Sequence, residues 1–204
     1  MNQTKLVIGV LAGTVVVLLG VGVLMARMEG KVAGAADVEG VAGEARLATG
    51  RATPKVTIVE WSDFQCPACK QAQYLVKEIL GQYPDDVRLV YRHFPLVQIH
   101  KNALAAAELA EAAAAAGKFW QMHDLLFERQ SEWAEDKDKL AEYRQELGIE
   151  LGGSYKDKVE ADMWEGQALG INATPTFFVN GKKIDVVKLK AVIEEELRSA
   201  QDGG

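Results

Sequence analysis

The only two cysteines of the chain lie three residues apart, in the tetrapeptide Cys66-Pro67-Ala68-Cys69. With no third cysteine, they cannot belong to a larger disulfide framework. A pair at this spacing either alternates between a dithiol and a disulfide or supplies half of a zinc site. A zinc site needs at least two more ligands, and the three histidines match no common ligand spacing. The pair therefore indicates redox chemistry, and we expect no metal and no cofactor.

The flanking residues predict that this pair opens a helix directly after a strand. Residues 55–61 are β-branched and apolar, and residues 70–81 carry apolar residues at near-helical spacing. Pro67 then falls at the first helical position, where its missing N–H costs nothing. Free N–H groups at a helix start stabilise an anion, so we expect the pKa of Cys66 to fall from about 8.5 into the range of about 3.5–7.5. Cys69, one turn further in, would resolve the mixed disulfide that Cys66 forms.

Residues 1–26 predict a membrane anchor. Residues 6–25 are uncharged and apolar, and as a helix they would be about 30 Å long, the thickness of a hydrocarbon core. This run is longer than the apolar core of a typical cleaved signal peptide; cleavage after Ala26 or after residues 33–35 is the alternative. Residues 27–53, rich in glycine and alanine, predict a flexible linker. A large domain after a single anchor is normally translocated, so we expect the folded part outside the cytoplasm.

The remaining chain, residues 54–204, predicts one α/β domain. A second strand is expected near 86–94, which completes a βαβ unit. Four helical patterns then follow, over 100–116, 118–130, 136–147 and 154–167. Strand character returns at 175–179 and 182–184 around the hairpin signal Asn180-Gly181, and an amphipathic helix over 187–199 follows. The net charge of −6, without a basic cluster, argues against nucleic acid as a partner.

Three motifs resemble those of the DsbA-like group of thioredoxin-fold disulfide oxidoreductases. They are Glu-Trp-Ser-Asp-Phe-Gln-Cys-Pro-Ala-Cys at 60–69, Gly-Lys-Phe-Trp-Gln-Met-His-Asp-Leu-Leu at 117–126 and Ala-Thr-Pro-Thr-Phe-Phe-Val-Asn-Gly at 173–181. The resemblance covers roughly residues 54–200. It implies a thioredoxin-like fold (βαβ…ββα) with a helical subdomain inserted at about 98–168, here preceded by an N-terminal transmembrane helix.

The resemblance also implies roles for individual residues. Cys66 and Cys69 become the catalytic pair, with Pro67 and Ala68 in the active-site loop at the helix start. The Thr174-Pro175 bond is expected to be cis and to lie beside the sulfurs, where the main chain of Thr174 offers hydrogen bonds to an extended substrate peptide. DsbA has histidine at the position of Ala68, so this chain is expected to be a weaker oxidant.

Glu60 is a further candidate catalytic residue. On the predicted strand it shares a face with Val56 and Ile58, and burial there would raise its pKa and make it a proton donor or acceptor. Its position six residues before Cys66 matches an acid that relays protons to the buried thiol in the DsbA-like pattern. The alternative is an inert, hydrated carboxylate at the strand end.

Other polar and aromatic residues favour ordinary structural roles. Lys70 either adds a cation beside the thiolate or is a solvated surface lysine. The histidines His93, His100 and His123 are interpreted as structural or solvated, and the aromatic residues Trp61, Phe64 and Trp164 line either a peptide-binding surface or the core.

These features lead to a first hypothesis, a membrane-anchored oxidase that introduces disulfides into exported cysteine-containing proteins. The resemblance implies a membrane quinone-linked partner of the DsbB or vitamin K epoxide reductase type for its re-oxidation. The alternatives are an extracytoplasmic reductase or isomerase, for instance in cytochrome c maturation, and a non-enzymatic thioredoxin-like chaperone or binding module. The spacing of the cysteines alone does not set the direction of electron flow.

Overall fold

The computed structural model describes residues 38–43 and 45–202 of the chain. The predicted anchor at 1–26 and the first part of the predicted linker lie outside the described residues. Among the helices of the described part, none has the length and the apolar character that crossing a membrane requires.

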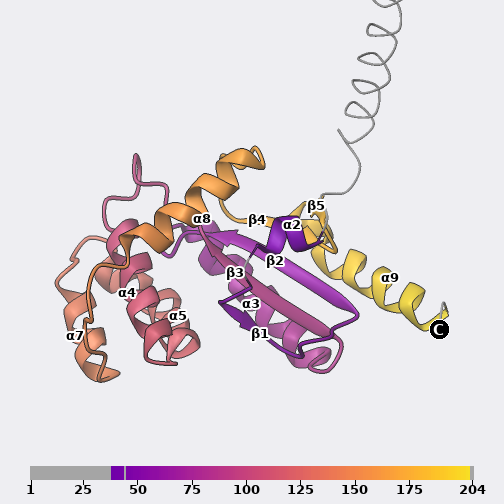
Figure 1. Cartoon of the computed structure of the whole chain (residues 1–204), viewed down its shortest axis with the longest axis horizontal. Helices are drawn as coiled ribbons and strands as arrows, with labels where there is room; N and C mark the ends of the chain where they lie inside the picture. The colour runs from indigo at the N-terminus through magenta and orange to yellow at the C-terminus, as the bar shows by residue number, and fades with distance from the viewer. Residues whose placement is uncertain (1–37, 44, 203–204) are drawn as a thin grey trace, which may run out of the picture. The chain divides into compact units, whose positions relative to one another are not determined.

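A five-stranded mixed sheet forms the centre of the fold, with the strands in the order β1-β3-β2-β4-β5 (Figure 1). Only the β2–β3 pair is parallel, as a βαβ unit requires; the other neighbouring pairs of this sheet are antiparallel. The strands are β1 (Ala48–Thr49), β2 (Val56–Ser62), β3 (Val87–His93), β4 (Thr176–Val179) and β5 (Lys182–Ile184). The expected α/β class is confirmed, and the predicted strands follow one another along the chain in the expected order.

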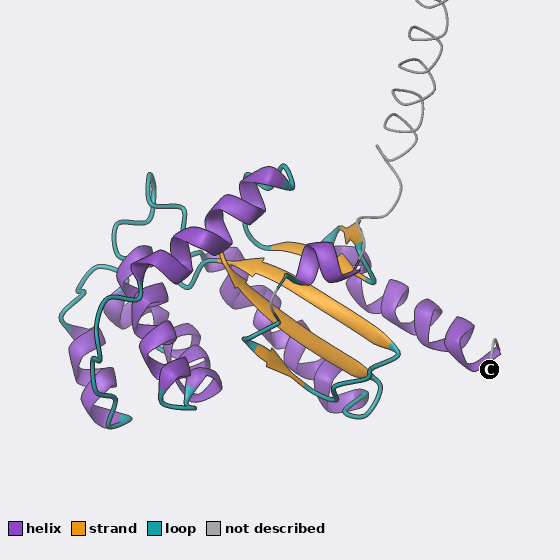
Figure 2. Ribbon diagram, in the orientation of Figure 1, coloured by secondary structure: helices purple, strands orange, loops and turns teal. Residues whose placement is uncertain are grey.

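Helices cover the sheet and form a separate group between β3 and β4. They are α2 (Val38–Ala42), α3 (Pro67–Gln82), α4 (Ala103–Ala115), α5 (Phe119–Glu128), α6 (Gln130–Trp133), α7 (Lys139–Glu146), α8 (Lys156–Ala168) and α9 (Leu189–Asp202), with a short 3₁₀ turn at Val186–Lys188. Figure 2 shows α4, α5 and α7 gathered beyond one end of the sheet. They pack around a core of their own that includes Leu126 and Trp133 and reaches both cysteines.

The alternation of side chains along β2 decides which residues face which helices. Val56 and Ile58 point to the face covered by α3 and α9, whereas Val59 and Trp61 point to the face covered by α2 and by the segment before β4. Glu60 therefore lies on the same face as Val56 and Ile58, as the sequence predicted, and this is the face on which α3 carries the cysteines.

Residues 38–43 and 45–49 correct the prediction of a flexible linker over 27–53. This part of the segment folds onto the domain, because β1 pairs with the edge of β3 and the side chains of Val41 and Leu47 are buried. The apolar residues here are isolated among glycine and alanine, so they show no periodicity in the sequence. Their burial, together with pairing along an otherwise open strand edge, is a tertiary effect.

Candidate active site

Cys66 and Cys69 lie at the start of α3, as predicted. Cys66 is the residue before the helix, in an extended conformation, and Pro67 is the first helical residue. Both cysteines are free thiols. Cys66 keeps 7% of its surface exposed, whereas Cys69 is fully buried, so only Cys66 is open to attack from outside.

The two thiols have opposite pKa shifts. The pKa of Cys66 is lowered to about 5 by a hydrogen bond from the Cys69 thiol, against the effect of its partial burial, with further help from the main-chain N–H groups of Cys69 and Ala68 and the hydroxyl of Thr174. Burial, the neighbouring Cys66 and the charge of Glu60 all raise the pKa of Cys69. Near neutral pH the pair therefore holds one thiolate, on Cys66, and one thiol, on Cys69.

The Thr174-Pro175 peptide bond is cis, as the resemblance implied. It precedes β4 and brings the main-chain carbonyl of Thr174 to 3.5 Å from the Sγ of Cys66, which donates a hydrogen bond to it when protonated. This places main-chain polar groups directly beside the exposed sulfur, where an extended peptide would need them.

Glu60 is fully buried, so the alternative of a hydrated strand end is wrong. Burial raises the pKa of its carboxyl group to about 7, against the opposing effect of hydrogen bonds. The amide of Gln73 supplies two of these bonds, one to each carboxylate oxygen, both at 3.0 Å. The sequence reading missed Gln73, although its position four residues after Cys69, on the same face of α3, was a signal that could have found it.

A buried carboxylate, Asp63, fixes the loop before α3. Its Oδ1 accepts a hydrogen bond from the main-chain N–H of Gln65 at 2.7 Å. Its Oδ2 lies 2.8 Å from the main-chain N of Leu96 and 2.7 Å from Nδ1 of His100. His100 thus has a structural role, as predicted: with Asp63 it ties the segment after β3 to the active-site loop.

Two glutamine side chains connect the same loop to the inserted helices. The amide of Gln130 donates to the main-chain carbonyls of Phe64 and Cys66, at 2.7 and 3.0 Å. Gln65 accepts from the main-chain N–H of Asn102 and donates to the carbonyl of Ala134, both at 2.8 Å. The helical insertion therefore holds the backbone at the cysteines in place.

The aromatic candidates divide between the core and the surface. Trp61 and Phe64 are buried, and Phe64 stacks on Tyr91 with a ring-centroid distance of 5.2 Å, so neither lines a surface for peptides. Trp164 is 70% exposed on α8. Lys70 is a surface residue whose Nζ donates to the carbonyl of Glu128, in agreement with the solvated reading.

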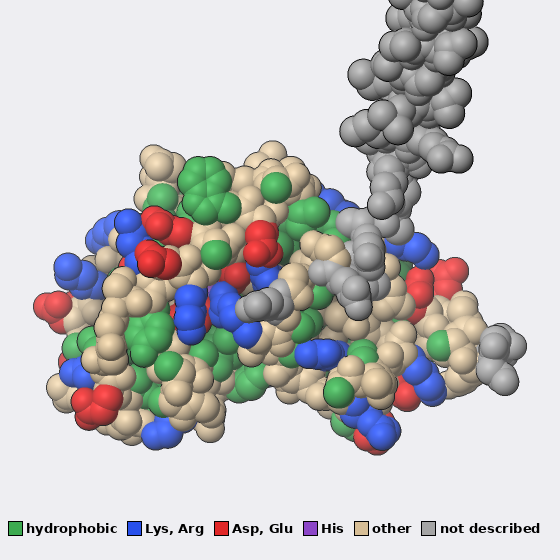
Figure 3. Space-filling model, viewed as in Figure 1, with side chains coloured by type: hydrophobic (Ala, Val, Ile, Leu, Met, Phe, Trp, Pro, Cys, Tyr) green, Lys and Arg blue, Asp and Glu red, His purple; other side chains and the backbone are tan. Residues whose placement is uncertain are grey.

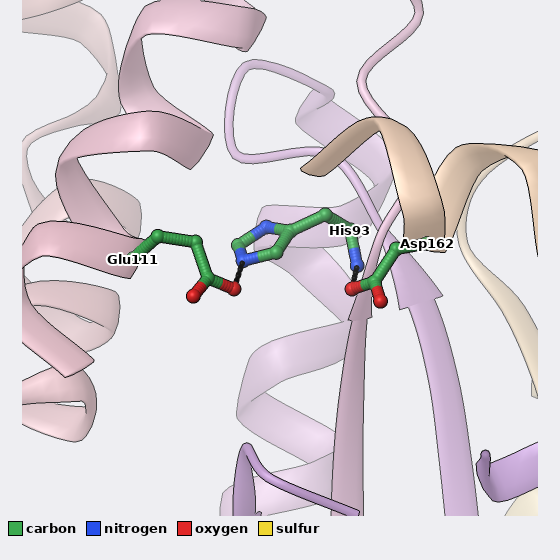
Figure 4. A group of neighbouring side chains, drawn as sticks. All are labelled: His93, Glu111 and Asp162. Atoms are coloured by element: carbon green, nitrogen blue, oxygen red, sulfur yellow. Dashed lines mark hydrogen bonds and ion pairs between the residues drawn. The ribbon is translucent and has the colours of Figure 1, made fainter. Parts of the chain in front are cut away.

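A second buried cluster joins β3 to α4 and α8. Potential ligand atoms of His93, Glu111 and Asp162 lie within 4.8 Å of one another, a spacing that a metal ion would accept. Figure 4 shows that Nε2 of His93 contacts Glu111 at 3.0 Å, while its main-chain N–H donates to Asp162 at 2.9 Å. Arg46 pairs with both carboxylates and Arg92 pairs with Asp162. Because two guanidinium groups already neutralise the two carboxylates, the cluster is an ion-pair network rather than a metal site.

Comparison with known proteins agrees with this site. A family model described as thioredoxin matches residues 43–197, and the chain belongs to this family. Among solved structures, BdbD from Bacillus subtilis is 25% identical with a TM-score of 0.59, over 82% of this chain and 98% of that one. DsbA2 of Pseudomonas aeruginosa is also 25% identical, with a TM-score of 0.52 over 73% of this chain and 92% of that one. A periplasmic thioredoxin-like protein from Salmonella enterica shares the fold, with 20% identity and a TM-score of 0.65 over 78% and 95% of the two chains.

The class of protein follows from the family and the site together. The chain is a thioredoxin-family protein that is similar in fold and site to DsbA-like thiol:disulfide oxidoreductases, in agreement with the resemblance drawn from the three sequence motifs. Curated relatives include a Na⁺/H⁺ antiporter NhaA of Salinispora tropica, which is 39% identical to this chain over 159 residues. The matched residues make up 72% of this chain and 24% of that protein. The chain spans about a quarter of the length of these relatives, so ion exchange remains a property of those longer proteins.

Proposed function

We propose that this chain exchanges disulfides with exported, cysteine-containing proteins through Cys66 and Cys69, and that its net reaction is oxidation of their thiols. The observation that supports this best is the lowered pKa of Cys66, about 5. A thiolate that is stable at neutral pH stabilises the reduced enzyme, and an enzyme with a stabilised reduced form is an oxidant.

The proposed reaction has two exchange steps. A client thiolate attacks the sulfur of Cys66 in the Cys66–Cys69 disulfide. The bond between the two cysteines breaks, and the released Cys69 takes up one proton. A second client thiolate then attacks the client sulfur of the mixed disulfide, and Cys66 leaves as a thiolate. Two electrons pass from the client to the enzyme, one client proton ends on Cys69 and the other in the solvent. Glu60, buried with a pKa of about 7, is the proposed donor of the proton to Cys69.

The main chain at Thr174 is the proposed binding site for the client backbone. Its carbonyl lies beside the Sγ of Cys66, so a peptide in an extended conformation that pairs with this main chain would bring its own cysteine close to that sulfur. On the face of the domain shown in Figure 3, acidic and basic side chains are interspersed. Main-chain recognition of this kind suits clients of varied sequence.

The proposed location is the extracytoplasmic side of the cell membrane, with residues 1–26 as a single-pass anchor. The uncharged run at 6–25 supports this. A catalyst that oxidises clients must pass two electrons onward, and a membrane quinone-linked partner of the DsbB or vitamin K epoxide reductase type is the proposed acceptor.

A reductase or isomerase is the second candidate function, and Ala68 favours it. An imidazole at this position would stabilise the thiolate further, so its absence lowers the oxidising power of the pair. A non-enzymatic chaperone or binding module is the third candidate. Insulin-reduction and thiol-oxidation assays with Cys66→Ala test it: full activity in the variant would exclude both enzyme functions.

The equilibrium potential of the Cys66–Cys69 pair against glutathione decides between the first two candidates. A potential near that of DsbA, about −120 mV, supports oxidation, and one near that of thioredoxin, about −270 mV, supports reduction.

A further inference from the structure

We infer that Gln73 is a positioning residue that holds the Glu60 carboxylate in the orientation and charge state from which it exchanges a proton with Cys69. The inference rests on the proposed function and adds to it a residue that touches neither the client nor the sulfurs. It starts from the contact between a buried amide and a buried carboxylate.

The contact between these two side chains is close and shielded from water. Nε2 of Gln73 lies 3.0 Å from each oxygen of Glu60, and the two residues keep 4% and 0% of their surfaces exposed. Hydrogen bonds to a charged acceptor are strong, and low dielectric surroundings strengthen them further. The amide therefore favours the ionised carboxylate, whereas burial favours the neutral acid.

The place of Gln73 on α3 links the acid to the resolving thiol. Gln73 follows Cys69 by four residues, so both side chains project from the same face of one helix. The charge of Glu60 in turn raises the pKa of Cys69. The helix α3 thus carries both the Cys69 thiol, which must gain or lose a proton, and the Gln73 amide, which holds the Glu60 carboxylate that exchanges that proton.

Several other groups lie around Glu60. Cys69 faces it from α3, the phenol of Tyr91 faces it from β3, and Phe177 is its partner in the sheet register on β4. The hydroxyl of Ser62, on β2, also lowers the pKa of Glu60. In the part of the chain that the structure describes, Glu60 has no ion pair with a lysine, an arginine or a histidine.

Gln73 also lines two hollows. It lines a hollow of about 180 Å³ between α3 and α5, together with Lys77, Trp120, His123 and Asp124. It lines a smaller hollow of about 50 Å³ beside Tyr74 and Phe127 as well. Gln73 therefore contacts Glu60 with its amide and borders both hollows.

The consequence of losing the amide has a definite sign. Without its hydrogen bonds the ionised form of Glu60 is less stable, so the pKa of Glu60 rises further and the acid stays protonated to higher pH. The step in which Cys69 must give up its proton then needs higher pH. The attack by Cys66, whose thiolate is already present, does not depend on Glu60.

An aromatic disulfide such as 5,5′-dithiobis(2-nitrobenzoate) separates the two steps in one experiment. The Cys66 thiolate of the reduced enzyme attacks it and releases one aromatic thiolate. Cys69 then loses its proton, attacks Cys66 and releases the second, while the Cys66–Cys69 disulfide forms. The rates of both phases are measured against pH for the wild type, for Gln73→Leu and for Gln73→Asn, whose shorter amide does not reach Glu60.

In both variants the rate of the first phase should be unchanged. The midpoint of the pH profile of the second phase should move up by about one pH unit or more, so that the second phase is about tenfold slower at pH values below the midpoint. Gln71→Leu, an exposed glutamine on the same helix, should leave both phases unchanged. In Glu60→Gln, the added Gln73→Leu change should have no further effect on the second phase. A variant that does not fold is recognised by its circular dichroism, and the other variant then carries the test.

A second phase with the wild-type pH profile in Gln73→Leu or in Gln73→Asn would overturn the inference, and so would an equal slowing of both phases. Failure of the proposed function looks different, because the wild-type enzyme itself would then release no second aromatic thiolate.

Discussion

The Sγ of Cys66 lies 3.5 Å from the main-chain carbonyl oxygen of Thr174, a residue 108 positions later in the chain. This contact joins the first turn of α3 to the segment that precedes β4. The reactive sulfur and the main chain proposed to bind the client are therefore held in one place by the sheet, and each can be altered separately.

The two cysteines should differ in what their loss does to client exchange. Cys66→Ser should reduce exchange to the background rate, because the buried Cys69 cannot be reached. Cys69→Ser should keep the attacking thiolate but lose the resolving step, so it should accumulate mixed disulfides with clients. Non-reducing gels of both variants, after incubation with client proteins that carry disulfides, test this, because the Cys66 thiolate attacks a client disulfide and releases one client thiolate. Equal trapping by Cys66→Ser would contradict the assignment.

The hydroxyl of Thr174 should contribute to the low pKa of Cys66. Thr174→Val keeps the β-branched shape and the main-chain carbonyl but removes the polar hydroxyl that lowers the pKa of Cys66, so that pKa should rise by up to about one unit. The potential of the pair should fall by up to about 30 mV. Thr176→Val is the matched control, because that hydroxyl donates to the carbonyl of Ala173 instead. An unchanged pKa in Thr174→Val would remove the hydroxyl from the account.

Glu60 should make stability depend on pH. Its folded pKa of about 7 lies above the ordinary value of 4.5, so its contribution to stability is fully present below pH 4.5 and is lost as the pH rises through 7. On going from acidic pH to pH 8, the free energy of unfolding of Glu60→Gln should therefore rise by about 3 kcal/mol relative to that of the wild type. Urea unfolding at both pH values measures the difference. Glu78→Gln, an exposed acid paired with Lys190, should show little such gain.

The ion-pair network around Asp162 should be important for stability rather than for chemistry. Asp162→Asn would remove one partner of Arg92, whose side chain is 3% exposed, and should cost about 3–5 kcal/mol of unfolding free energy. Glu165→Gln is the control, because that carboxylate also pairs with Arg92 but is 51% exposed and should cost under about 1 kcal/mol. Equal costs for the two variants in urea unfolding would contradict the role given to burial.

Local patterns in the sequence were enough to predict the frame of the site. The alternation along β2 predicted which face Glu60 shares, and the proline at the start of α3 predicted where the helix begins. Both features depend on residues within a few positions of each other, so they can be read from one segment. The cis bond at Thr174-Pro175 followed only from the resemblance, since no local signal marks it.

Contacts between distant segments could not be predicted in this way. Arg46 and Asp162 are 116 residues apart, and nothing in either segment specifies their pairing. The pairing of residues 48–49 with the sheet depends likewise on an edge of β3 that only the assembled domain provides. The hydrogen bond from Gln73 to Glu60 is an intermediate case. The position of Gln73 on its helix could be predicted from the local sequence, but which strand packs against that face of the helix could not.

The pKa of the Cys66 thiol tests the central claim most directly. The ultraviolet absorbance of the thiolate is followed against pH in the reduced protein, with Cys66→Ser as the blank. The account predicts a transition near pH 5 that is absent from the blank. The pKa of Cys66 should rise more in Cys69→Ala than in Cys69→Ser, because serine can still donate a hydrogen bond to the thiolate. A transition at about 8.5, the value of an ordinary cysteine, would contradict it.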